Sequence, residues 1–123
     1  MRAKAHPLKL KRVYEPADKS DGFRVLVDRL WPRGLSKEKA QVDLWLKEIA
    51  PSDELRRRFH GQPTKWREFA AAYAKELKAE PAAAALESLR DCARRETVTL
   101  LFAARDEDHN NAVALKDLLE KTA

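Results

Sequence analysis

Two segments of the chain constrain its fold more than any other feature. They are "RVLVDRLWPRG" (residues 24–34) and "VTLLFAARDEDHNNA" (residues 98–112), and each begins as an apolar run and becomes charged at its carboxyl end. Hydrophobic residues occupy successive positions in both runs, so both faces of an extended segment would be apolar. Such strands are typical of the centre of a parallel sheet that is covered on both sides. We therefore predict buried strands over residues 23–31 and 97–105.

The rest of the chain adds one further strand pattern and several helix patterns. Alternating apolar and basic residues predict a half-buried strand over residues 8–15. Residues 42–51 combine an extended start with a helical or irregular end. Helices are expected at 36–41, 52–60, 64–80, 81–96 and after residue 106, with Ser52 capping one and Asp106 or Asp108 capping the last. This order predicts a single three-layer α/β domain over residues 1–123, with a mostly parallel sheet, helices on both faces and flexible residues 1–7.

One predicted helix carries an aromatic stripe. Trp66, Phe69 and Tyr73 follow one another at intervals of three and four residues, which places them on one face of an amphipathic helix. We interpret this stripe as part of the core. The helix before it contains three arginines at residues 56–58, which we interpret as a solvated face with anion binding as the alternative, and His60 as a helix-end residue.

The basic charge of the chain is concentrated near its beginning. The formal net charge is +5, and residues 1–40 hold 11 of the 25 basic side chains but only five of the 20 acidic ones. This asymmetry favours anionic ligands, nucleotides or nucleic acid as partners, although scattered lysines also solvate ordinary surfaces. A nucleic-acid-binding or regulatory module is therefore an alternative function, and it predicts one exposed patch containing Lys9, Lys11, Arg12, Arg24 and Lys37.

Several classes of protein are disfavoured by what the sequence lacks. The single cysteine, Cys92, allows no internal disulfide and no multi-cysteine zinc site. There is no phosphate-binding glycine motif and no nucleophile elbow. No apolar run approaches the roughly 20 residues that span a bilayer, and the first residues contain no apolar signal-peptide segment. We expect a cytoplasmic protein without a membrane partner, metal or cofactor.

The candidate site follows from the two buried strands. Ligands of open α/β sheets bind outside the carboxyl ends of the strands. If the two strands are parallel neighbours, their charged ends meet around one crevice. The catalytic candidates there are Asp28, Asp106 and His109, and the ligand-binding candidates are Arg29, Trp31, Arg33, Arg105 and Asn110.

These residue types suit an anion. Guanidinium groups bind phosphate or carboxylate through two parallel hydrogen bonds, and the start of the last helix supplies free backbone N–H groups. Trp31 could stack on a flat ligand, an aspartate could orient an arginine or act as a base, and His109 could contact the reacting group. We therefore predict a site for a small anionic or nucleotide-like ligand, with catalysis left open.

Two other interpretations need no ligand. Asp28 and Arg29 could pair with Arg105 and Asp106 in a buried network that sets the strand register, although such pairs add little net stability. Alternatively the protein could act only through a protein partner, in which case an exposed apolar patch would replace the polar crevice.

The motifs of the two strand ends also carry a family resemblance. "DRLWPRG" and the element "AARDEDHNNA", together with "LWLKEIAPSDELR" and "WREFAAAYAKEL", resemble the YeaO-like group of the bacterial domain of unknown function 488 over residues 8–119. The resemblance implies a small cytoplasmic α/β protein. The signature falls on Asp28, Arg29, Trp31, Pro32, Arg33, Gly34, Pro51, Ser52, Asp106, Asn110 and Ala112. More distant relatives carry a cysteine where this chain has "HNN", so thiol chemistry is not expected here.

Overall fold

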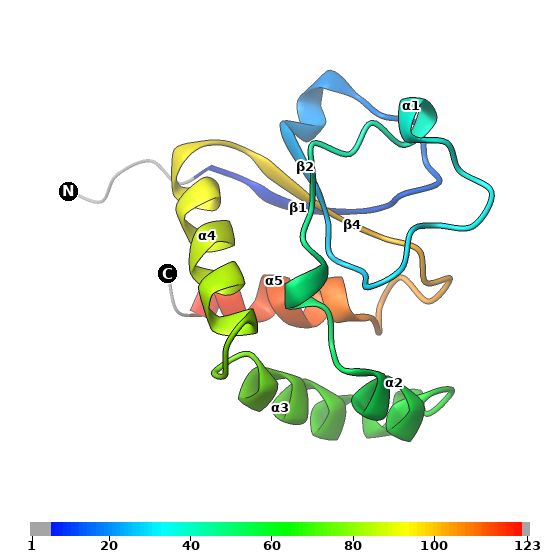
Figure 1. The fold of residues 1–123 in the computed structure, drawn as a ribbon, viewed down its shortest axis with the longest axis vertical. Helices are drawn as coiled ribbons and strands as arrows, with labels where there is room; N and C mark the ends of the chain where they lie inside the picture. The colour runs from blue at the N-terminus through cyan, green and yellow to red at the C-terminus, as the bar shows by residue number, and fades with distance from the viewer. Residues whose placement is uncertain (1–5, 122–123) are drawn as a thin grey trace.

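The central feature of the computed structural model, which describes residues 6–121, is a four-stranded sheet in which all pairings are parallel (Figure 1). The order across the sheet is β1 (Leu8–Arg12), β4 (Val98–Phe102), β2 (Phe23–Leu26) and β3 (Leu44–Trp45). The two strands predicted to be central are therefore neighbours, and every residue of β4 is buried. The predicted α/β class and parallel sheet are confirmed.

Helices cover the two faces of this sheet unequally. The helices are α1 (Lys37–Ala40), α2 (Asp53–Phe59), α3 (Trp66–Glu76), α4 (Ala82–Arg95) and α5 (Asn111–Lys121), with short 3₁₀ turns at Lys19–Asp21, Lys47–Ile49 and Pro63–Lys65. Figure 1 shows α3, α4 and α5 gathered on one side of the sheet and α1 on the other. The three-layer prediction is therefore correct, with one thin layer made of α1 and its flanking loops.

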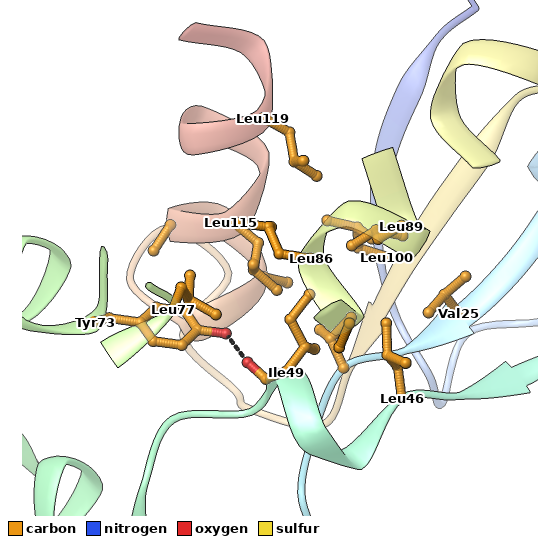
Figure 2. Close-up of a cluster of buried hydrophobic side chains, with 14 of the residues drawn as sticks. Val25, Leu46, Ile49, Tyr73, Leu77, Leu86, Leu89, Leu100, Leu115 and Leu119 are labelled. Carbon is orange, nitrogen blue, oxygen red and sulfur yellow. Dashed lines mark hydrogen bonds between the residues drawn. The ribbon is translucent and has the colours of Figure 1, made fainter. Parts of the chain in front are cut away.

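Alternate residues of the central strands β2 and β4 pack on opposite faces of the sheet, in two separate hydrophobic clusters. Val25 and Leu100 pack in the larger core with Leu89 and Leu115 of the helices (Figure 2). Leu26 and Leu101 point the other way, into a smaller cluster with Ala40. Both faces of these strands are thus removed from water, which is the physical reason for their unbroken apolar sequence.

Three predicted strands are too long at their carboxyl ends. The first ends at Arg12, not at residue 15, and β4 ends at Phe102, not at residue 105. β2 ends at Leu26, not at residue 31, and Leu30, which a longer central strand would bury, is 66% exposed. For β2 and β4 the reason lies in one side chain, that of Asp28. The N–H of Val27 still bonds to the carbonyl of Leu101 (3.1 Å), but the next β4-side donor, the N–H of Ala103, bonds to the Asp28 carboxylate (2.9 Å) instead of a strand.

The helix caps are partly as predicted. Ser52 caps α2, because its hydroxyl accepts the N–H of Leu55 (3.1 Å). The prediction that Asp106 or Asp108 caps the last helix is wrong. The Asn110 side-chain oxygen accepts the N–H of Val113 (3.0 Å) and so caps α5, while the Asp106 carboxylate organises the turn before the helix.

The predicted basic patch does not form as a single exposed surface. Arg24 is only 4% exposed and its guanidinium lies 2.6 Å from the Asp21 carboxylate, which also binds Lys11 (2.9 Å). Arg24 also donates to the carbonyl oxygens of Ala40 and Gln41. A desolvated arginine needs this full set of partners. Arg24 therefore joins β2 to the end of α1 and the residue that follows it, and contributes no surface charge.

Two further observations concern residues 6–121 as a whole. None of their helices is long and apolar enough to cross a membrane. They also contain no group of three or more His, Cys, Asp and Glu side chains arranged to hold a metal ion. Of the residues expected to be flexible, 1–5 lie outside the described range, while the Pro7 carbonyl accepts the N–H of Val98.

Candidate functional site

The carboxyl edge of the sheet holds two adjoining depressions. The first, called the arginine depression below, has a volume of about 380 Å³ and is lined by Asp28, Trp31 and three arginines, Arg29, Arg33 and Arg56. The second, called the aromatic depression, has a volume of about 460 Å³ and is lined by Phe59, Trp66 and Phe69 together with Arg105, Asp106 and His109. Both are large enough for part of a small-molecule ligand.

The two depressions share one wall. Pro51, Arg56, Ala104 and Asn111 line both of them. The wall thus combines the turn before α2, α2 itself, the loop after β4 and the first residue of α5. Because this wall lies between the two depressions, the eight predicted site residues fall into two groups, one in each depression.

All eight predicted site residues lie at this edge, but in two groups. Asp28, Arg29, Trp31 and Arg33 line the arginine depression, and Arg105, Asp106, His109 and Asn110 line the aromatic depression. No hydrogen bond or ion pair joins the first group to the second within residues 6–121. The alternative in which Asp28 and Arg29 pair with Arg105 and Asp106 is therefore wrong.

Asp28 is the structural junction of the site. One carboxylate oxygen accepts the N–H of Ala103 (2.9 Å), and the other accepts the side-chain amide of Asn111 (3.2 Å). The same Asn111 amide also donates to the carbonyl of Val27 (2.8 Å). Burial raises the pKa of Asp28, while these two hydrogen bonds and the nearby Arg56 charge oppose the rise in pKa. The carboxylate thereby ties the end of β2 to the end of β4 and the start of α5.

The arginines are only loosely held. The Nη2 atom of Arg29 lies 3.4 and 3.5 Å from the carbonyl oxygens of Ala50 and Pro51, at or near the limit of a hydrogen bond. Its buried Nε has no hydrogen-bond partner among the described residues and lies 4.0 Å from Asp53. Arg56 has a firmer contact with Asp53 (2.6 Å).

The other two guanidinium groups carry their charge without a partner. Neither Arg33 nor Arg105 has a side-chain hydrogen bond or ion pair within the described part of the chain, and both residues are exposed. The edge therefore has a surplus of cationic groups over the carboxylates that could neutralise them. Such a surplus attracts anions.

Asp106 and His109 form a local pair. The Asp106 carboxylate accepts the N–H groups of Asp108 and His109 (3.0 Å each) and lies 3.1 Å from Nδ1 of His109. The backbone N–H of Asp108 and the contacts with His109 lower the pKa of Asp106. The pair is exposed, and its carboxylate already accepts three contacts from its own turn.

Two of the three tryptophans, Trp31 and Trp45, use the indole N–H inside the protein, whereas Trp66 lines the aromatic depression. Trp31 donates to the carbonyl of Leu35 (2.6 Å) and meets Trp45 edge-on at 5.4 Å in the smaller core. Trp45 donates to the carbonyl of Asp28 (2.8 Å). Trp66 is half-buried beside Phe69, with ring centres 5.6 Å apart, and its indole N–H has no hydrogen-bond partner among the described residues.

The core interpretation of the aromatic stripe thus holds fully for Tyr73 alone. Tyr73 is 1% exposed, and its hydroxyl donates to the carbonyl of Ile49 (Figure 2). Burial is the main cause that raises the pKa of Tyr73 well above its usual value. Trp66 and Phe69 pack against the core with one side and line the aromatic depression with the other.

Comparison with known proteins assigns the chain to a family. A family model described as "Inactive DUF488-N3 subclade" matches residues 7–123. The chain belongs to this family, DUF488-N3i. It is 44% identical over 112 residues to the protein YeaO of Escherichia coli, covering 91% of this chain and 96% of YeaO. It is equally similar, at 44% over 112 residues, to the Mycobacterium bovis protein Mb3100c, covering 91% and 92% of the two chains. No solved structure matches it significantly.

In this DUF488-N3i chain the residues of the family signature contribute to the carboxyl edge of the sheet in different ways. Pro51 forms part of the shared wall, Ser52 and Asn110 cap α2 and α5, and Ala112 is fully buried. Gly34, at φ 76°, occupies the left-handed region that favours glycine. Several of these residues therefore shape the edge through helix caps, burial and a left-handed turn.

Besides the aromatic residues of the second depression, sequence reasoning missed two polar residues of the shared wall. Asn111 is the second asparagine of "HNN", and only its contact with Asp28 reveals its role. Arg56 belongs to the arginine triplet for which anion binding was the second interpretation. Its neighbours Arg57 and Arg58 line neither depression, so helical geometry selects one arginine of the three.

Proposed function

We propose that this DUF488-N3i protein binds a small anionic ligand at the carboxyl edge of its sheet, without catalysing a reaction on it. Arg29, Arg33 and Arg56 hold the anion in the arginine depression. The observation that carries this proposal is the group of three guanidinium groups around one depression, of which Arg29 and Arg33 are weakly partnered or unpartnered among the described residues. A guanidinium that keeps free donors is ready for a bidentate anion.

Two observations favour binding over catalysis. The matching family model is described as an inactive subclade. In addition, both candidate carboxylates already serve the fold, because Asp28 accepts hydrogen bonds from β4 and α5, and Asp106 accepts three contacts from its own turn. We therefore assign Asp28 and Asp106 as positioning residues.

The test compares two arginines of the same helix. Isothermal titration with inorganic phosphate, pyrophosphate, ribose 5-phosphate and citrate is performed on the wild type, Arg56→Gln and Arg57→Gln. Both variants lose one exposed positive charge from α2, but only Arg56 lines the depressions. The ion pair that Arg56→Gln removes is on the surface and contributes at most about 1 kcal/mol to stability, so both variants should fold.

We expect at least one of these anions to bind the wild type and to lose on the order of tenfold in affinity in Arg56→Gln, because a charge-assisted hydrogen bond contributes about 1.5–3 kcal/mol. Arg57→Gln should remain within about twofold of the wild type, since a distant surface charge is screened by salt. Equal losses in the two variants, or no binding by any of the anions, would refute the proposal.

A further inference from the structure

We infer that the ligand joins a planar aromatic ring to its anionic group, as a nucleoside phosphate does. Its ring occupies the aromatic depression and its phosphate occupies the arginine depression. This inference rests on the proposed anion-binding function and specifies the class of ligand.

The first argument is the lining of the aromatic depression. Phe59, Phe69 and Trp66 form a continuous aromatic set there, with centroid separations of 5.9 Å (Phe59–Phe69) and 5.6 Å (Trp66–Phe69). His109 extends the set, because its ring meets Trp66 edge-on at 5.4 Å. A simple phosphate or carboxylate ligand would gain nothing from such a surface, whereas a nucleobase stacks on it.

The second argument is that one hydrogen-bond donor of this aromatic surface, the indole N–H of Trp66, has no partner among the described residues. Trp31 and Trp45 each donate the indole N–H to a backbone carbonyl, but Trp66 has no such partner among residues 6–121. A fully buried tryptophan usually finds a protein partner for this group, whereas the half-buried Trp66 keeps its N–H available to a ligand. A ring with acceptor atoms at its edge would satisfy the Trp66 N–H in the bound state.

The third argument is the geometry of the shared wall. Arg56 and Asn111 line both depressions, so a ligand lying across the wall contacts the same two side chains from either side. The two volumes, about 460 and 380 Å³, lie in the range of single small-molecule pockets. A ring joined through a sugar to a phosphate has this two-part shape.

The experiment separates the ring from the anion. Binding of the four ribonucleoside 5′-monophosphates, ribose 5-phosphate and a 5′-phosphorylated trinucleotide is measured by isothermal titration on the wild type, Trp66→Leu and Trp66→Phe. Leucine removes the aromatic face but remains apolar, and phenylalanine keeps a stacking surface. Ribose 5-phosphate serves as the control for folding, because it needs only the arginine depression.

We expect at least one nucleotide to bind the wild type on the order of tenfold more tightly than ribose 5-phosphate. Trp66→Leu should lose most of that advantage while its affinity for ribose 5-phosphate stays within about twofold, and Trp66→Phe should retain more of the advantage than Trp66→Leu. Equal affinity for nucleotides and ribose 5-phosphate would overturn this inference and leave the anion site standing. Failure of every phosphate compound to bind would overturn this inference, and failure of citrate as well would remove the proposed function itself. Tighter binding of the trinucleotide than of every mononucleotide would show that the site binds the end of a nucleic acid. That result would overturn the inference that the ligand is a free nucleotide.

Discussion

Asp28 offers the sharpest test of how the edge of the sheet is built. Its two carboxylate oxygens accept one donor each, the N–H of Ala103 (2.9 Å) and the amide of Asn111 (3.2 Å). Asp28→Asn preserves the shape of the side chain but turns one acceptor into a donor. One of the two facing donors must then lose its partner, and an unpaired, largely desolvated donor costs about 1–3 kcal/mol. Because the substitution also removes a desolvated charge, we expect the unfolding free energy to fall by about 1–2 kcal/mol at neutral pH.

The pH dependence of this effect follows from the raised pKa of Asp28. Burial raises that pKa above its ordinary value of 3.8, so between the two values the folded protein binds more protons than the unfolded chain. The Asp28 contribution to the unfolding free energy is therefore greatest at low pH and decreases as pH rises through the folded-state pKa. The amide that Asp28→Asn introduces does not titrate. Hence the unfolding free energy of the wild type minus that of Asp28→Asn should decrease with rising pH over this interval.

Urea unfolding of both proteins, followed by tryptophan fluorescence from pH 4 to 8, measures this difference. Asp43→Asn is the matched control, because the exposed Asp43 carboxylate accepts a single backbone N–H, that of Arg24 (2.8 Å), which an amide oxygen can also accept. The control should change the unfolding free energy by less than about 0.5 kcal/mol. An equal loss in both variants, or a wild-type advantage that grows with pH, would show that Asp28 is not the junction described above.

Two further substitutions test local features. Asn110→Ala removes the cap of α5 and should lower the unfolding free energy by about 1 kcal/mol, whereas Asp108→Ala should be nearly neutral, as compared by urea unfolding; a larger loss for Asp108→Ala would return the cap to the aspartate. Gly22→Ala should be much more damaging than Gly34→Ala, because at φ 65° its Cβ would lie 2.3 Å from the Thr97 carbonyl oxygen. Gly34→Ala, at φ 76° with open space around it, should lose only about 1–2 kcal/mol, which thermal unfolding would compare directly; similar melting temperatures for the two variants would contradict the predicted clash.

The fold class could be predicted because it depends on patterns that few structures satisfy. The apolar run at residues 25–27 and the largely apolar run at residues 98–102 require cover on both faces, and the structure provides it through two separate clusters. Ser52 could be assigned as a cap because capping depends on the next three residues only. The strand ends were predicted less well. The ends of β2 and β4 depend on Asp28, whose side chain takes the place of a backbone partner and so stops the ladder earlier than apolar content suggests. β1 ends where the chain turns, with the N–H of Glu15 bonded to the carbonyl of Arg12.

The candidate site, too, could be predicted from the sequence in part only. That polar residues gather at the carboxyl edge follows from parallel strands alone, and all eight candidates lie there. Their separation into two depressions does not follow, because it depends on where α2 and the start of α5 pack. The placement of α2 brings Arg56 into the site and leaves Arg57 outside it.

By itself, the sequence determined a parallel α/β sheet buried on both faces, a charged edge at the ends of its central strands, and membership of a family through the motifs of that edge. The tertiary structure decided which charges are available. Arg24, which the sequence places among exposed basic residues, is buried against Asp21, whereas Arg33 and Arg105 remain without partners in the described chain. The physical reason is that hydrophobic periodicity is local and survives in any arrangement of the elements. The partner of a charged side chain, in contrast, comes from whichever distant segment packs beside it.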